Sequence, residues 1–324
     1  MKQKLLALGL VLTMILSFAA CGSKTQTTNV GAKKYTIGIC QMAQHPALDA
    51  ATKGFMDAVN EAMPGEVTFD NQNASGDINQ CGVICTGFAA NNVDLILANA
   101  TPSLQAAATA TVDIPILGTA VTEYGVALEL ADFNGTVGGN VSGTADLAPL
   151  DQQAAMVKEF FPEAKTVGIL YCSAEPNSKY QADIVEKELQ KLGCTVSRYT
   201  FADSNDVSSV TAMACDENDV LYIPTDNTAA NCAQTINNVA EPKKTPIIAG
   251  EESICKACGV ATLTIDYYEL GRNTGQMAVE ILKNGKNISE MPIQYFANPV
   301  KKVNTEKANA FQLTVPADYI SLAD

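Results

Sequence analysis

The sequence predicts an α/β protein with two doubly wound parallel-sheet lobes. Short β-branched runs alternate with stretches whose apolar residues recur at helical spacing, a pattern typical of β-α-β units. After a glycine- and proline-containing segment around residues 140–150, the same series begins again. Removing the first 34 residues leaves roughly 290 of the 324, enough for two domains of ordinary size.

The first series opens with a strand at residues 35–40, followed by an amphipathic helix within residues 45–62. In that helix Leu48, Phe55 and Val59 recur at helical spacing. Three more strands and an Ala-rich helix complete the series. We expect the strands at 67–72, 93–100 and 114–120 and the Ala-rich helix at 103–112.

The second series repeats the alternation and ends in a different arrangement. A helix within residues 264–285 carries apolar residues at helical spacing through Leu270, Met277 and Ile281. We expect the earlier strands at 166–172, 195–201, 219–225, 245–251 and 260–265, a helix at 178–193, and late strands at 291–296 and 310–315.

The first 20 residues have the features of a secretory signal peptide. Lys2 and Lys4 precede an apolar run that is shorter than the roughly 20 residues a spanning helix needs. The ending "FAAC" resembles the lipobox of bacterial lipoproteins, with Phe18 in place of the usual leucine. We therefore expect cleavage before Cys21 and acylation of its thiol; an uncut anchor or an ordinary Ala-x-Ala cleavage are the alternatives.

Residues 21–34 are small and polar, without apolar periodicity, and are expected to form a flexible tether. Acyl chains on Cys21 would then hold a soluble, extracytoplasmic body at the outer face of the cell membrane. The formal net charge is −14, and losing Lys2 and Lys4 with the leader makes it −16. Nucleic acid is excluded as a partner, because phosphate binding needs clustered Lys and Arg.

Ten cysteines are present, and assigning Cys21 to lipid leaves an odd number that cannot all pair internally. The close pairs are Cys81 with Cys85 and Cys255 with Cys258. A Cys-x-x-Cys motif serves as a redox couple, half a zinc site or a local disulfide. A zinc ribbon needs a second such pair, and a thioredoxin-like strand is missing before the motif. We expect buried small thiols with at most one local disulfide, and no metal.

Several long segments closely resemble the substrate-binding lipoproteins of ABC transporters, a family with the type I periplasmic-binding-protein fold that includes tryptophan- and tyrosine-binding members. The resemblance covers the chain from Tyr35 onward; Phe18 and the many cysteines are departures from it. The segments that carry it include "GICQMAQHPALDAATKGFMDA", "LILANATPSLQAAA", "NVSGTADLAPL" and "AGEESICKACGVATLTIDYYELGRNTGQMA".

The resemblance implies how the two lobes are connected and what the protein does. The chain is expected to cross a hinge three times, giving one lobe from residues 35–146 plus 270–291 and another from 147–269 plus 292–324. The implied function is ligand capture by lobe closure, with an ABC permease as partner, no cofactor and a monomeric state.

Ligands of doubly wound sheets bind beyond the carboxyl ends of the strands. The side chains at these positions are polar or acidic and include almost no Lys or Arg. The candidate ligand-binding residues are Gln41, His45, Asn99, Ala100, Thr101, Thr122 and Thr144 in the first lobe, and Ser173, Glu175, Asn177, Ser178, Asp226, Asn227 and Glu251 in the second.

This composition favours a free amino acid over a phosphate or dicarboxylate, which would need strong cations. The ligand carboxylate is expected at the helix N-terminus that carries Ala100 and Thr101. Its ammonium is expected to pair with Asp226 or Glu175. An aromatic ligand side chain would meet Tyr124, Tyr180 and His45, whereas Tyr267 and Tyr268 are expected to pack at the hinge. A sugar or nucleoside is the alternative ligand.

Each candidate also has a structural alternative. Asn99, Asn177 and Ser178 are typical helix caps or turn residues, and His45 is a plausible N-terminal capping residue. Asp226 and Glu251 could be solvated loop acids.

An enzyme is disfavoured, since the sequence has no Gly-x-Ser-x-Gly elbow and no Walker loop. A sensor that passes closure to a membrane receptor is the remaining alternative to transport.

Overall fold

The first lobe is built on a parallel sheet. The computed structural model describes residues 34–296 and 298–322. Within them this sheet has six strands in the order β11-β5-β4-β3-β1-β2, and every neighbouring pair is parallel. The strands are β1 (Tyr35–Gln41), β2 (Val67–Asn73), β3 (Leu95–Asn99), β4 (Ile116–Val121), β5 (Val141–Ala145) and β11 (Gln294–Tyr295).

The second lobe contains a seven-stranded sheet within the described residues, in the order β13-β12-β10-β9-β8-β6-β7. Its neighbours are parallel except β12, which runs antiparallel to β10. The strands are β6 (Thr166–Cys172), β7 (Thr195–Phe201), β8 (Val220–Ile223), β9 (Ile247–Ala249), β10 (Ala261–Thr264), β12 (Val300–Val303) and β13 (Ile320–Ser321).

Helices cover both faces of the first sheet, which is why its central strands β3 and β4 are buried along their whole length and mostly apolar. Phe55 and Met277 pack with Ile37 in one core, and Cys81 and Leu104 contribute to a second core. The helices are α2 (Pro46–Ala62), α3 (Ile78–Ala90), α4 (Thr101–Ala110), α5 (Tyr124–Ala127) and α12 (Tyr267–Leu282), with a 3₁₀ turn η1 (Ile288–Glu290).

The second sheet is covered in the same way. Val157 and Val185 lie in one core with Ile169, while Ile236 and Ile254 lie in another. The helices are α6 (Leu150–Phe160), α7 (Pro176–Lys191), α8 (Val207–Glu217), α9 (Asn227–Asn231), α10 (Ala233–Lys243), α11 (Glu252–Cys258) and α13 (Thr305–Ala310). Two doubly covered, mostly parallel sheets confirm the predicted fold class.

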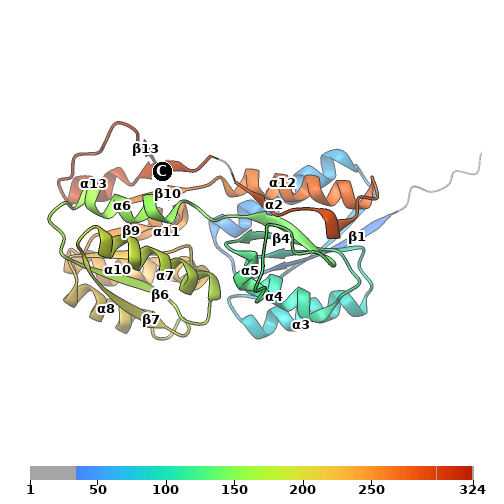
Figure 1. Ribbon diagram of the computed structural model, residues 1–324, viewed down its shortest axis with the longest axis horizontal. Helices are drawn as coiled ribbons and strands as arrows, with labels where there is room; N and C mark the ends of the chain where they lie inside the picture. Colours follow the sequence, from blue (N-terminus) through green and yellow to red (C-terminus); the bar gives the residue numbers. More distant parts are fainter. Residues whose placement is uncertain (1–33, 297, 323–324) are drawn as a thin grey trace, which may run out of the picture. The chain divides into compact units, whose positions relative to one another are not determined.

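Helices α2 and α12 lie side by side, although they are far apart in the sequence (Figure 1). Glycines permit this close approach. A Cβ atom on Gly54 would lie 2.0 Å from the carbonyl oxygen of Tyr268, and one on Gly271 would lie 2.0 Å from that of Ala51. The two backbones can therefore pack at a distance that any larger residue would prevent.

The chain passes between the sheets three times, as expected from the resemblance. It leaves the first sheet after β5, returns to it for α12 and β11, and then enters the second sheet at β12. Two boundaries differ from those expected. Helix α12 begins at Tyr267, not at residue 270, and Gln294 pairs with Thr144 of β5, which places residues 294–295 in the first sheet instead of the second.

One predicted strand is wrong. Residues 310–315 do not form a strand: α13 ends at Ala310, and Gln312 has a left-handed φ of 56°. Their apolar side chains pack on the second-lobe core instead, since Phe311, Leu313 and Val315 all contact it. The antiparallel strand of this sheet is β12, whose sequence "VKKV" carries little apolar signal.

The predicted leader, Cys21 and the tether up to residue 33 lie outside the described residues. Among residues 34–296 and 298–322, no helix combines the length and the apolar character needed to cross a membrane.

Candidate functional site

A small cavity lies at the carboxyl ends of strands from both sheets, the position predicted for doubly wound folds. Its free space is about 10 Å³, roughly enough for one water molecule. This space is too small for an amino acid. The lining residues are His45, Ala47, Leu48, Ala120, Thr122, Asp146, Asn177, Thr225, Asp226, Asn227, Ala230, Glu251 and Tyr267.

Six of the fourteen candidate residues line this cavity. They come from both lobes and are His45, Thr122, Asn177, Asp226, Asn227 and Glu251. The lining contains three carboxyl groups, and none of its described residues is Lys or Arg. This acidic, cation-free character agrees with the composition expected from the sequence.

The other eight candidates lie outside the lining, and most are engaged in hydrogen bonds of the protein itself. Asn99 donates to Leu48 O over 2.9 Å, and Thr52 donates to Gln41 Oε1 over 2.6 Å. Thr144 pairs with Thr274 over 2.8 Å. Outside the lining are Gln41, Asn99, Ala100, Thr101, Thr144, Ser173, Glu175 and Ser178.

Glu175 is fully buried and accepts five hydrogen bonds, one of them from the side-chain amide of Asn177 over 3.3 Å. Its Oε1 accepts from the backbone N–H and hydroxyl of Thr228, at 2.9 and 2.8 Å. Its Oε2 accepts from the backbone N–H and the side-chain amide of Asn227, at 3.1 and 2.6 Å. Both oxygens therefore hold the β8–α9 loop in place, which leaves little capacity for a ligand ammonium.

Asp226 and Glu251 line the cavity but also cap helices. Asp226 accepts from the backbone N–H groups of Ala229 and Cys172, both over 2.7 Å. Burial, together with the nearby charge of Glu175, raises the pKa of Asp226 to about 7. Glu251 accepts from the N–H groups that begin α11, at 2.8 Å and 2.6 Å.

Asp146 is the carboxyl group whose bonding is incomplete. It follows β5 directly and is only 3% exposed. The Tyr267 hydroxyl donates to its Oδ2 over 3.0 Å, while its Oδ1 has no hydrogen-bond partner. Burial raises the pKa of Asp146 to about 6, although the hydrogen bond from Tyr267 opposes this shift. Asp146 is not among the candidate residues predicted from the sequence, where residue 146 marks only the edge of a lobe.

His45 and Asn177 also line the cavity, and each has one polar atom without a hydrogen-bond partner. The side-chain amide nitrogen of Asn227 donates to Glu175, so its Oδ1 faces His45 Nε2 at 3.5 Å. Nε2 is thereby assigned the proton, and His45 Nδ1 is unpartnered. Asn177 uses Nδ2 for three contacts, while its Oδ1 is unpartnered. These two atoms and Asp146 Oδ1 are therefore available in the lining to a water molecule or a ligand.

The aromatic residues differ from those expected. Tyr124 lies in the first-lobe core, where its hydroxyl donates to Thr144 O over 3.1 Å, and it does not line the cavity. Tyr180 also lies outside the lining. Tyr267 begins α12 at a crossing between the lobes, as expected, but it lines the cavity as well.

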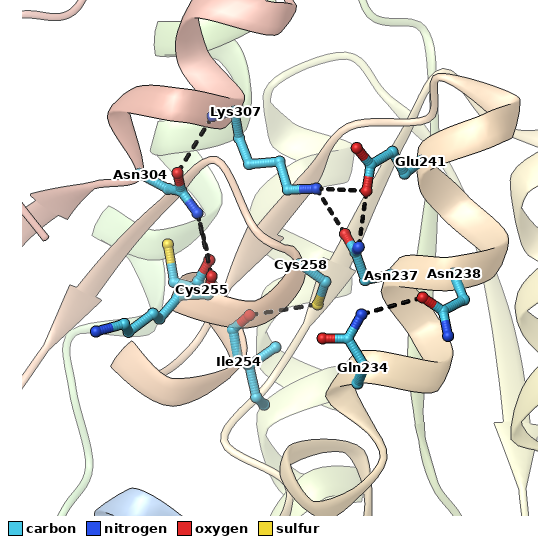
Figure 2. Close-up of polar contacts among 10 residues, drawn as sticks. Gln234, Asn237, Asn238, Glu241, Ile254, Cys255, Cys258, Asn304 and Lys307 are labelled. Atoms are coloured by element: carbon cyan, nitrogen blue, oxygen red, sulfur yellow. Dashed lines mark hydrogen bonds and ion pairs between the residues drawn. The ribbon is translucent and has the colours of Figure 1, made fainter. Parts of the chain in front are cut away.

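The cysteines contribute no disulfide within the described residues, where all nine are free and eight are buried. In the Cys-x-x-Cys segment, the Cys258 thiol donates to Ile254 O over 3.3 Å, while the Cys255 sulfur lies on the side of Asn304 (Figure 2). Burial raises the pKa of Cys258 to about 12, so its thiol stays protonated and unreactive. In the described part of the chain, no group of three or more His, Cys, Asp and Glu could hold a metal ion.

Comparison with known proteins places this site in a family context. The model of the family described as ABC transporter substrate binding protein matches residues 36–324. A tyrosine-binding protein of Clostridioides difficile is 38% identical over 264 residues, which cover 81% of this chain and 76% of that protein.

Two solved structures are also similar. An ABC domain from Streptococcus pneumonia in complex with L-Trp is 30% identical, with a TM-score of 0.86 over 90% of this chain and all of that chain. A ligand-free, open substrate-binding protein with adhesive properties from Clostridium difficile is 37% identical, with a TM-score of 0.67 over 89% of this chain and all of that chain.

Proposed function

The chain belongs to the family of ABC transporter substrate-binding proteins, and from this premise we propose that it captures a free aromatic amino acid between its lobes. The observation that carries the ligand class is the unpartnered Oδ1 of Asp146, a buried carboxylate oxygen in a cavity without Lys or Arg. An aromatic side chain is supported by relatives described as binding tyrosine or holding L-Trp.

In this proposal the ligand ammonium binds Asp146. The sequence suggested Asp226 or Glu175 for this role, but both oxygens of each already accept backbone or side-chain donors. Asp146 Oδ1 is free of such contacts, and the ammonium would supply both the missing donor and a counter-charge. The bond from Tyr267 keeps the carboxylate oriented.

The ligand carboxylate is assigned to His45. Its Nδ1 is the ring nitrogen without a partner in the lining, since Nε2 faces Asn227 Oδ1. The His45 ring on one side and the Asp146 carboxylate on the other would contact the two charged groups of a zwitterion. The helix N-terminus at Ala100 and Thr101, which the sequence suggested, lies outside the cavity lining.

Lobe closure is the proposed mechanism of capture. The lining residues come from both sheets, so only a closed arrangement contacts the ligand from both sides. The chain also superposes more closely on the relative that contains L-Trp than on a relative of higher identity that is ligand-free and open, which supports a hinge motion.

The cellular part of the proposal follows the sequence. The mature protein would be a monomer, held at the outer face of the membrane by lipid on Cys21, and would deliver its ligand to an ABC permease. Capture and release need no bond to be made or broken, so no catalytic role is assigned.

Calorimetric titration with tyrosine and two analogues tests the ligand class. Tyramine lacks the carboxylate and 3-(4-hydroxyphenyl)propionate lacks the ammonium. Tyrosine should bind at one site, and each analogue at least about tenfold more weakly, as expected for a lost charge-assisted hydrogen bond. Equal binding of the propionate would reject the ammonium assignment, and binding of sugars alone would reject the amino-acid proposal.

A further inference from the structure

Asn177 lies at the start of α7 in the second lobe and is 4% exposed. Its amide orientation follows from its contacts, since Nδ2 lies 3.3 Å from Glu175 Oε2, 3.2 Å from Ser178 Oγ and 3.3 Å from Thr225 O. A carboxylate and a backbone carbonyl are acceptors, so the nitrogen must face them. Oδ1 is therefore the side-chain atom of Asn177 that is available to the cavity, and it has no hydrogen-bond partner.

An unpartnered, buried carbonyl oxygen needs a donor. The ligand ammonium is already drawn to Asp146, because an ionised oxygen forms a stronger hydrogen bond than a neutral amide oxygen. Asp146 follows β5 of the first lobe, whereas Asn177 comes from α7 of the second lobe. The two acceptors thus approach the ligand from different lobes, and the one on α7 is available to a different part of the ligand.

We propose that Asn177 Oδ1 accepts a hydrogen bond from a donor on the ligand side chain, so that the site selects amino acids with a phenol O–H or indole N–H over phenylalanine. This inference rests on the proposed function and makes it more specific. Selection of this kind can be strong, because a ligand without the donor leaves the buried oxygen unpaired when the lobes close.

The competing arrangement is that the three N–H groups of one ammonium serve both Asp146 and Asn177. The two arrangements predict different results for ligands that share the same α-amino and α-carboxyl groups. If Asn177 contacts the ammonium, its removal weakens tyrosine and phenylalanine equally. If Asn177 contacts the side chain, its removal weakens tyrosine alone.

The experiment is a set of calorimetric titrations of the wild-type protein, Asn177→Ala and Asn309→Ala with tyrosine and phenylalanine. Wild type should bind tyrosine at least about tenfold more tightly than phenylalanine, and Asn177→Ala should bring this ratio close to one by weakening tyrosine binding. Asn309 is exposed on α13, so Asn309→Ala should preserve both affinities.

A second comparison on the wild-type protein does not depend on the folding of a variant. Tryptophan should bind at least about tenfold more tightly than 1-methyltryptophan, which lacks the indole N–H. Equal wild-type affinities for tyrosine and phenylalanine, or a ratio that survives in Asn177→Ala, would overturn the inference while leaving the proposed function intact. Failure of wild type to bind any aromatic amino acid would overturn both.

Discussion

The hydroxyl of Tyr267 donates to Oδ2 of Asp146 over 3.0 Å, and the two residues belong to different crossings between the lobes. Asp146 directly follows β5, where the chain leaves the first sheet, and Tyr267 opens α12, where it returns. The same carboxyl group has its other oxygen unpartnered in the cavity lining. A ligand bound to Asp146 would therefore act at the hinge itself.

Replacing Asp146 with Asn is the first test of this relationship. The change removes the counter-charge for the ammonium, so the affinity for tyrosine should fall by about 1–3 kcal/mol in calorimetry. The ligand-free protein should become more stable at pH 7, by up to roughly 3 kcal/mol, because a buried carboxylate with a pKa raised from 3.8 to about 6 is ionised there at a cost.

Thermal unfolding of the ligand-free variant measures the second effect. An Asp146→Asn protein that binds tyrosine as tightly as wild type, or that is less stable than wild type without ligand, would contradict the role assigned to Asp146.

The affinity for tyrosine should depend on pH through the titration of the Asp146 carboxyl group. The folded-state pKa of about 6 lies above the usual value, so Asp146 makes the ligand-free protein less stable as pH rises from about 4 to about 6. The ammonium prefers the ionised carboxylate, so the tyrosine affinity should rise with pH up to about 6. Above that pH the affinity should change little. Titrations at pH 5 and pH 7.5 should differ by up to about tenfold.

Asp226 also lines the cavity and has a pKa raised to about 7, and the variant separates its contribution. In Asp146→Asn the change between pH 5 and pH 7.5 should shrink markedly. An unchanged pH profile in that variant would assign the titration to Asp226 instead.

Local sequence patterns were enough to predict most of the fold. The strands expected at 166–172 and 195–201 have the same bounds as β6 and β7, because a β-branched or aromatic run bounded by turn residues is a strong local signal. Strand β12 was not predicted, because its two adjacent lysines interrupt the apolar alternation that is typical of a strand. Lys302 pairs with Glu252 over 2.6 Å and Lys301 with Asp318 over 2.9 Å, contacts that only the folded chain provides.

The site was predicted less completely, for a physical reason. A polar residue after a strand can be located from the sequence, but the state of its oxygens cannot. Four of the five donors to Glu175 come from Asn227 and Thr228, more than 50 positions away, and Tyr267 lies 121 positions from Asp146. The sequence therefore favours Glu175, whose oxygens already accept hydrogen bonds within the fold. It gives no signal for Asp146, whose Oδ1 accepts none.

The lipid anchor is tested by replacing Cys21 with Ser. The thiol is the proposed acylation site, and serine cannot form the thioether, so the variant should appear in the medium instead of the membrane fraction. Its tyrosine affinity should match that of wild type, because the site lies more than 20 residues further along the chain. Retention of Cys21→Ser on membranes would contradict the anchor.

The packing of α2 against α12 leads to a prediction on stability with a built-in control. A Cβ on Gly271 would meet the Ala51 carbonyl oxygen at 2.0 Å, so Gly271→Ala must push the helices apart and should lower the free energy of unfolding by about 1–3 kcal/mol. Gly82 also lies inside a helix, α3, but a Cβ there would meet nothing within 4 Å.

Gly82→Ala should therefore raise the free energy of unfolding by about 0.5–1 kcal/mol, since alanine loses less backbone entropy in a helix. Denaturant unfolding of both variants measures the contrast. Equal effects of the two substitutions would mean that helix propensity, and not the contact between α2 and α12, governs Gly271. If Gly271→Ala is less stable and Gly82→Ala more stable than wild type, the loss of stability comes from the contact between α2 and α12, because the chemical change is the same at both positions.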